Sequence, residues 1–137
     1  MTFYEITEAD RELIGEAMAT LQKNFDAVNH FHIVGAAVRC TDGAVFTGVN
    51  CDGIHGSCAE YVAVGAAVNA GYRAFDTIVA THLKAPNGVV SPCGNCRQML
   101  FTYDPEVRVI VNNDEGELVK VGIRDLLPFA YEEIPLD

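Results

Sequence analysis

The segment SPCGNCRQML, residues 91–100, places two cysteines three positions apart directly behind a proline. Proline fits the first turn of a helix, because its missing N–H would have no partner there. Residues 93–103 are therefore predicted to form a helix that presents Cys93 and Cys96 on one face, one turn apart. Such a pair suits a redox couple, half of a metal site or ordinary core packing, and the choice depends on which other residues reach it.

A second helix is predicted for residues 57–70, which begin SCAEYV. Cys58 falls in its first turn, where the helix dipole favours a thiolate. Glu60 follows two residues later, about 200° around the helix, so it would not face a metal from the same side. Three thiolates leave one tetrahedral position of Zn²⁺ open for water, as in catalytic zinc sites. The pattern therefore predicts zinc held by Cys58, Cys93 and Cys96, with Glu60 as a proton carrier beside it.

The rest of the chain alternates short apolar runs with helical segments and contains no linker or repeat. This organisation predicts one domain over residues 1–137, an α/β sandwich whose later strands, joined through helices, run parallel. Thr7 and Asp10 form the pattern of a capping box that opens an N-terminal helix of about four turns. The remaining expected elements are strands at residues 33–40, 44–50, 75–82 and 107–113, with a hairpin turn at 41–43, and a short helix at 122–127.

The amino-acid composition limits the kinds of molecule that the chain is expected to bind. The chain has 137 residues, 50% hydrophobic and 20% charged, which is ordinary for a globular domain with its own core. Nine Lys plus Arg against nineteen Asp plus Glu give a formal net charge of −10, which argues against a nucleic-acid partner. No apolar run approaches the ~20 residues of a membrane span. Five cysteines without a secretory pattern suit a reducing compartment, so we expect a cytoplasmic protein with no membrane partner.

The cysteine motifs also carry a family resemblance. Cys58-Ala59-Glu60 followed by Pro92-Cys93-Gly94-Asn95-Cys96 matches the C-x-E…P-C-x-x-C signature of zinc-dependent nucleoside deaminases. The chain resembles the cytidine deaminase superfamily over residues 34–131, and within it the blasticidin-S deaminases more closely, through VFTGVN, SCAEYVAVGAA and VGIRDLLPFAY. The resemblance implies a three-layer α/β/α sandwich with a mixed five-stranded sheet. It also implies hydrolysis of a cytosine-type nucleoside to its uracil form with release of ammonia.

Roles for further residues follow from this resemblance position by position. The backbones of Ala59 and Ser91 would contact the pyrimidine carbonyl and the departing amine, and Asn50 would hold a sugar hydroxyl. Asp52 stands where the cytidine-specific members carry a glutamate, one methylene longer. His32 stands where an aromatic residue usually precedes VGAA, and we expect it to bind substrate. The segment 50–58 is also shorter than in typical cytidine deaminases, so the wall beside the sugar is reshaped.

Two more implied roles concern the surroundings of the zinc and the assembly. Arg97 and Gln98 resemble residues that hydrogen-bond the ligating thiolates, and one arginine would offset the net −1 charge of a tris-thiolate zinc centre. Small deaminases of this type are usually homotetramers, in which an aromatic near the C-terminus enters a neighbour's site. Tyr131 resembles that aromatic residue.

Several alternatives stay open on the residues alone. Glu60 could serve only as part of a capping box with Ser57. Cys51 or His55 could close the zinc shell and make the site structural, so a structural zinc or redox module is the non-catalytic alternative. The motifs do not choose between pyrimidine salvage, which acts on cytidine and deoxycytidine, and antibiotic resistance by inactivation of blasticidin S. These activities differ in the shape of the pocket and share the zinc chemistry.

Overall fold

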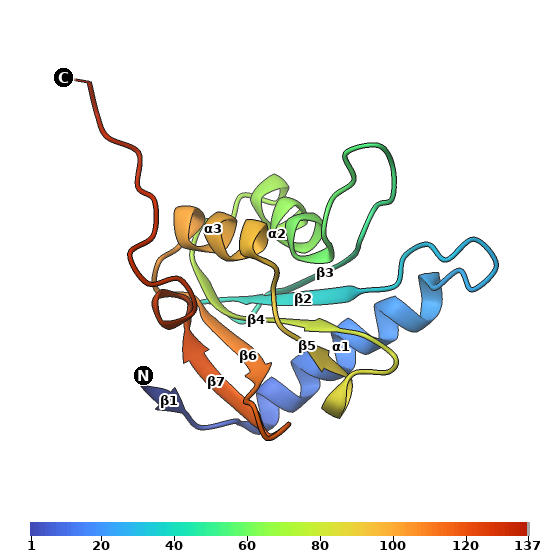
Figure 1. The fold of residues 1–137 in the computed structure, drawn as a ribbon. Helices are drawn as coiled ribbons and strands as arrows, with labels where there is room; N and C mark the ends of the chain where they lie inside the picture. The colour runs from blue at the N-terminus through green and yellow to red at the C-terminus, as the bar shows by residue number, and fades with distance from the viewer. Residues whose placement is uncertain (137) are drawn as a thin grey trace.

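The computed structural model describes residues 1–136 and shows one mixed sheet with helices on both faces (Figure 1). The helices are α1 (Glu8–Asn24), α2 (Ala59–Asn69) and α3 (Gly94–Tyr103), with the short 3-10 helices η1 (Pro86–Gly88) and η2 (Ile123–Leu126). The strands are β1 (Phe3–Tyr4), β2 (Gly35–Cys40), β3 (Val45–Val49), β4 (Phe75–Thr81), β5 (Val89–Val90), β6 (Arg108–Asn112) and β7 (Leu118–Gly122). Each helix and strand expected from the sequence is present near its expected position. Within the described range, no helix is both long and apolar enough to cross a membrane.

The strands follow the order β1-β7-β6-β4-β2-β3, and β5 pairs with β4 beside this path. β2 and β3 form the predicted antiparallel hairpin. β4 and β6, which are connected through α3, run parallel as predicted. The expected count of five strands is wrong, because seven strands pair in the described part of the chain. Three strands were not among the four located in the sequence, namely β7, with five residues, and β1 and β5, which have only two residues each, too few to show a periodic apolar pattern.

The two faces of the sheet carry separate layers of helix, as the α/β/α prediction required. On β2, Ala36 and Val38 pack in the cluster that contains the buried residues of α2 and α3. Ala37, between them, packs with Leu13 and Ala17 of α1 in a second cluster. This alternation places α2 and α3 together on one face and α1 on the other (Figure 1). The two helices that begin with cysteines therefore share a face.

Two glycines allow the helices to approach the sheet closely. A Cβ on Gly35 would lie 2.5 Å from the carbonyl oxygen of Ala17 in α1. A Cβ on Gly48 of β3 would lie 2.7 Å from the backbone nitrogen of Ala63 in α2. Contacts this short are incompatible with a side chain, so each glycine fixes the height of one helix above the sheet. The contact at Gly48 matters for the site, because it sets the position of α2.

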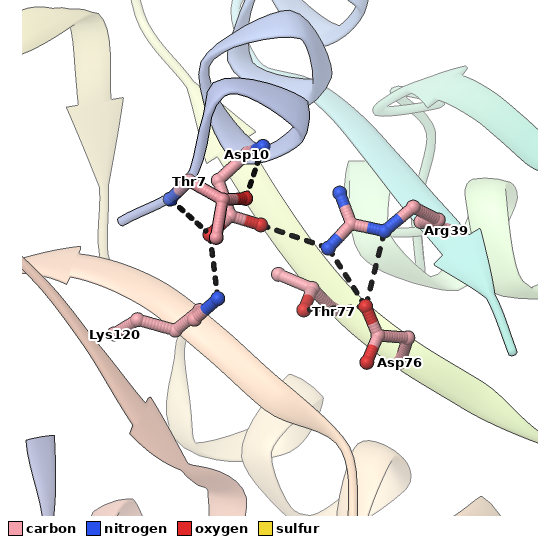
Figure 2. A network of polar contacts seen from close by, with 6 residues as sticks. All are labelled: Thr7, Asp10, Arg39, Asp76, Thr77 and Lys120. Carbon is pink, nitrogen blue, oxygen red and sulfur yellow. Dashed lines mark hydrogen bonds and ion pairs between the residues drawn. The ribbon is translucent and has the colours of Figure 1, made fainter. Parts of the chain in front are cut away.

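A buried network of charges ties α1 to the sheet on the face opposite α2 and α3 (Figure 2). The predicted capping box is present, since Asp10 N donates to Thr7 Oγ1 and Thr7 N donates to Asp10 Oδ2. The Asp10 side chain is fully buried and also accepts hydrogen bonds from Arg39 Nη2, at 2.8 Å, and from Lys120 Nζ. Arg39 continues the network to Asp76 of β4. One carboxylate therefore connects the start of α1 with β2 and β7.

The hydrogen bonds of this network determine the ionisation of Asp10. Burial by itself raises the pKa of the carboxyl, but hydrogen bonds from Lys120, Thr7 and Arg39 outweigh that effect and lower the pKa to about 2. Because this value lies below the 3.8 of an unperturbed aspartate, the ionised carboxylate stabilises the fold above pH ~4. That contribution is lost as the pH falls from about 4 towards about 2.

Lys120→Met should lower the free energy of unfolding at neutral pH by about 3 kcal/mol, because it leaves the buried Asp10 carboxylate without one of its two cations. Urea denaturation of both proteins measures the difference, which should shrink below pH ~4. Glu106→Gln is the control, because it breaks an exposed pair with Arg124 and should change stability little. Equal stability of the two variants would contradict a stabilising role for the network.

Candidate zinc and substrate site

Three cysteine side chains converge where α2 and α3 begin. Cys58 and Cys93 are the residues immediately before the two helices, and Cys96 lies in the first turn of α3. Their three sulfur atoms lie within 4.8 Å of one another, and Cys58 Sγ and Cys93 Sγ are 3.6 Å apart. A tetrahedral ion with Zn–S bonds of about 2.3 Å separates two of its sulfur ligands by about 3.8 Å. The cluster therefore fits a single zinc ion.

The thiols differ in how easily they ionise. Burial raises the pKa of Cys58 and of Cys96, because a thiolate removed from water loses its hydration. At Cys93 the same burial is outweighed by hydrogen bonds, the largest from the backbone N–H of Cys96, and the pKa is lowered. The lowered thiol pKa expected for Cys58 at the start of its helix is therefore not found, whereas the pKa of Cys93 is lowered. Three adjacent thiolates repel one another, so their joint ionisation requires a cation among them.

The residues that could have closed the zinc shell do not join the cluster. Among the described residues, the only group of three or more metal-binding side chains that meets consists of the three cysteines. Cys51 and His55 lie elsewhere on the wall of the adjoining cavity. Three protein ligands leave a tetrahedral ion with one position for water or substrate, which is the arrangement of catalytic zinc sites.

Glu60 lies beside the cysteine cluster and is nearly inaccessible to solvent, with 5% of the residue exposed. Burial raises the pKa of its carboxyl, although hydrogen bonds with its own backbone and with Cys96 oppose this shift. The N-cap of α2 is Cys58 and has no side-chain cap, so the alternative capping box between Ser57 and Glu60 does not form. A buried carboxyl with a raised pKa in a cavity is a typical proton-transfer group.

A cavity of about 630 Å³ opens beside the cysteine cluster, a size suited to a small organic ligand. The starts of α2 and α3 contribute Cys58, Ala59, Glu60 and Cys93 to its wall, as predicted. Further predicted site residues on the wall are Ser91, before α3, and Asn50 and Asp52, after β3. No lysine or arginine lines this cavity in the described part of the chain. The structure thus places seven of the residues predicted from the sequence around one space.

The comparison with known proteins bears on this site directly. Residues 7–112 match the family model for the cytidine and deoxycytidylate deaminase zinc-binding region. The chain belongs to this deaminase family. The match and the three-cysteine cluster together identify zinc as the cofactor of the deaminase, with Cys58, Cys93 and Cys96 as the residues able to hold it.

Individual relatives of the deaminase match almost its whole length. The blasticidin-S deaminase of Bacillus cereus is 34% identical over 140 aligned positions, which cover 96% of this chain and 98% of the relative. A cytidine deaminase of Sporosarcina psychrophila is 30% identical over 126 positions, covering 89% and 90%. The crystal structure of cytidine deaminase from Burkholderia pseudomallei has a TM-score of 0.72 at 34% identity, covering 88% of this chain and 98% of that one. These relatives are hydrolytic enzymes, and so is the present deaminase.

Asn50 and Asp52 form a polar pair on the cavity wall of the deaminase. Asn50 Oδ1 accepts a hydrogen bond from Val34 N at 3.0 Å, so the amide nitrogen Nδ2 faces the Asp52 carboxylate, 3.4 Å from Oδ2. His32, predicted to contact substrate, is absent from the residues found to line the cavity. It instead contacts the backbone of Asn50 and the side chain of Asp52.

Arg97 and Gln98 have partners other than the thiolates predicted for them. Arg97 donates to the carbonyl oxygens of Pro92, at 2.9 Å, and of Leu126, at 3.0 Å. Helical side chains lean towards the helix N-terminus, which brings the guanidinium to the segment before Cys93. Gln98 donates to Thr102 and to the carbonyl oxygen of Tyr131. Within residues 1–136, neither side chain has a hydrogen bond to a cysteine sulfur. Both instead hydrogen-bond to other segments near the cluster.

Tyr131 does not reach the cavity of its own chain. Its residue is 71% exposed, and it lies with Phe101 and Arg124 along a separate groove. The sequence did not single out Asn95, which lines the cavity and lies between Cys93 and Cys96 in the chain. Its Oδ1 lies 3.5 Å from Tyr61 Oη, so the two residues bridge the starts of α3 and α2. The only signal for Asn95 was its position inside the C-x-x-C motif.

The purified deaminase should contain one zinc ion per chain, and Cys93→Ala should lose it because two sulfur ligands bind zinc far more weakly than three. Elemental analysis after dialysis measures the ratio. Cys51→Ala is the matched control, since it removes another exposed cysteine from the same cavity wall and should retain the ion. Loss of zinc from the Cys51 variant, or retention in the Cys93 variant, would contradict this ligand set.

Proposed function

We propose that the deaminase hydrolyses a cytosine-type nucleoside, namely cytidine, deoxycytidine or an analogue, to the uracil form and releases ammonia. The observation that carries the proposal is the convergence of Cys58, Cys93 and Cys96 beside buried Glu60 in one cavity. A structural zinc site would not need a buried proton-transfer group facing an open cavity. A redox pair would not need a third cysteine and a glutamate beside it.

Glu60 is assigned the proton transfers of this reaction. The chemistry that zinc supplies when bound is activation of water for attack on the ring carbon that bears the amine. Burial keeps the pKa of Glu60 raised, so its carboxyl can accept the proton of the water and pass it to the ring nitrogen. Water thus provides the new carbonyl oxygen. Its second proton, from the hydroxyl then attached to the ring carbon, would pass through Glu60 to the amine, so that the carbon–nitrogen bond breaks and the amine leaves as ammonia.

The backbones of Ala59 and Ser91 are assigned the role of orienting the pyrimidine base. Ala59 is fully buried at the start of α2, and Ser91 precedes the α3 cysteines on the same wall. Backbone groups at these two positions can bind the ring carbonyl and the departing amine, because each lies one or two residues from a zinc-binding cysteine. The ring would then be held with its reactive carbon at the cysteine cluster.

Asn50 and Asp52 are assigned the role of binding the group attached to the ring. Because Asn50 Oδ1 accepts from Val34 N, the group that the amide directs towards Asp52 is the donor Nδ2, while Asp52 offers an acceptor. A hydroxyl group can accept from one and donate to the other, so the pair suits a sugar hydroxyl. A cavity wall without lysine or arginine, in a chain with net charge −10, disfavours a phosphate. We therefore favour a nucleoside over a nucleotide as substrate.

An antibiotic deaminase of the blasticidin-S type is the second candidate. The 34% identity to the blasticidin-S deaminase of Bacillus cereus, over nearly the whole of both chains, favours it. The zinc cluster and Glu60 would serve both substrates in the same way. The two kinds of deaminase would differ in which substituent of the cytosine ring fits the cavity wall around Asn50 and Asp52.

Glu60→Gln should reduce kcat for ammonia release at least a hundredfold while zinc stays bound, because glutamine has the same shape and cannot carry a proton. Ammonia release from cytidine, deoxycytidine and blasticidin S, assayed in parallel, measures the effect and identifies the preferred substrate. Cys51→Ala serves as the active control. If the zinc-loaded wild type released ammonia from none of the three compounds, the proposed substrate class would be wrong.

We also infer that the deaminase is a single domain over residues 1–137 and acts in the cytoplasm as a homotetramer, in which Tyr131 enters the cavity of a neighbouring copy. Tyr131 is exposed and lies outside its own cavity, and the segment around it carries other exposed apolar side chains. These residues are Phe129, Ile134 and Leu136. Burial against another copy would remove this apolar surface from water.

Tyr131→Ala should raise KM for the preferred substrate by about tenfold, the loss expected when one aromatic contact is removed from a binding site. Steady-state kinetics together with light scattering test the contact and the assembly. Tyr131→Phe retains the ring and should stay close to wild type. A fully active monomer, or an unchanged KM in the alanine variant, would contradict the contribution of a neighbouring copy.

A further inference from the structure

The backbone of His32 has an unusual conformation beside the cavity. Its φ is 56°, in the left-handed region that residues other than glycine seldom adopt. Such a conformation costs free energy and persists where the surrounding contacts impose it, often at functional sites. The contacts of His32 show what imposes it here.

His32 binds the Asn50–Asp52 segment through both its backbone and its side chain. The backbone N–H of His32 donates to Asp52 Oδ2 at 3.0 Å. The ring atom Nδ1 lies 2.7 Å from the carbonyl oxygen of Asn50. Because a carbonyl oxygen can only accept, Nδ1 must carry the proton in this contact. The same ring atom lies 3.8 Å from Asp52 Oδ2.

These contacts fix the donor and the acceptor that face the cavity. Val34 N holds Asn50 Oδ1, and Asn50 N donates to the carbonyl oxygen of Val34 at 3.2 Å. His32 and Val34 therefore hold both the backbone and the side chain of Asn50. Of these two residues, His32 is the one that also contacts Asp52. The left-handed φ allows one residue to direct its N–H to Asp52 while its ring reaches Asn50.

We propose that His32 is a positioning residue for substrate specificity, which holds the amide of Asn50 and the carboxylate of Asp52 at the spacing that receives a sugar hydroxyl. This inference rests on the proposed function, because it assumes that the substrate carries such a hydroxyl. His32 itself touches no substrate. Its effect is therefore on binding of the sugar, with the zinc cluster and Glu60 unaffected.

Two substitutions separate the ring contact from the backbone conformation. His32→Gly adopts a left-handed φ without strain and keeps the backbone N–H, but it removes the Nδ1 donor. His32→Asn tolerates the same φ and offers an amide nitrogen at nearly the position of Nδ1. We expect His32→Gly to raise KM for cytidine about tenfold with kcat changed less than twofold, and His32→Asn to restore KM. Zinc content should equal that of wild type in both variants.

Two further kinetic comparisons connect the effect to the hydroxyl. 2′,3′-Dideoxycytidine lacks the 2′- and 3′-hydroxyls of the sugar, so wild type and His32→Gly should have the same KM for it. In an Asp52→Ala background, His32→Gly should add less than twofold, because the residue that it positions is already removed. A full tenfold effect in either comparison would overturn the proposal.

Crystal structures of the two variants test the positioning independently of activity. The Asn50 amide should move away from the Asp52 carboxylate in His32→Gly, which loses the ring contact to Asn50, and stay within about 3.5 Å of it in His32→Asn. An unmoved Asn50 in the glycine variant would overturn the positioning role. If wild type released ammonia from none of cytidine, deoxycytidine and blasticidin S, the proposed function would fail, whereas the variant structures would still decide whether His32 positions the pair.

Discussion

The convergence of three sulfur atoms where two helices begin is the constraint on which the site depends. Cys58 and Cys93 are 35 residues apart in the chain, yet their sulfurs are 3.6 Å apart. This geometry requires α2 and α3 to lie side by side on one face of the sheet, at a fixed height. Gly48 sets that height for α2, because any side chain there would meet the helix backbone. The metal cluster is therefore a property of how the helices pack on the sheet.

The opposite face of the sheet is stabilised by a different kind of interaction. There, Asp10 of α1 pairs with Arg39 of β2 and with Lys120 of β7, 110 positions away in the chain (Figure 2). Removing either cation would leave a buried carboxylate incompletely paired, which would weaken the attachment of α1 to the sheet. The other face of the strands that this network connects packs against α2 and α3. The sheet thus carries structural charges on one face and the reactive groups on the other.

In the proposed function, chemistry and substrate specificity would rest on separate segments of the chain. The helix starts provide the cysteines and Glu60, which suit every substrate that carries an amine on a cytosine ring. The loop after β3 provides Asn50 and Asp52, and the segment before β2 provides His32, which holds them. This separation explains why family membership follows from the cysteine motifs while the substrate does not. A change in the loop can alter the accepted group without disturbing the zinc-binding residues.

The sequence by itself determined the helices, four of the five longer strands, and which three cysteines meet, because each depends on local spacing or on a motif at a helix start. The capping box of Thr7 and Asp10 and the turn at Gly43 were predictable for the same reason. Only the tertiary structure decided β7 and the short strands β1 and β5, the partners of Arg97, the burial of Asp10 and the position of His32. These features arise from contacts between segments distant in the chain, to which neither residue spacing nor local propensity is sensitive.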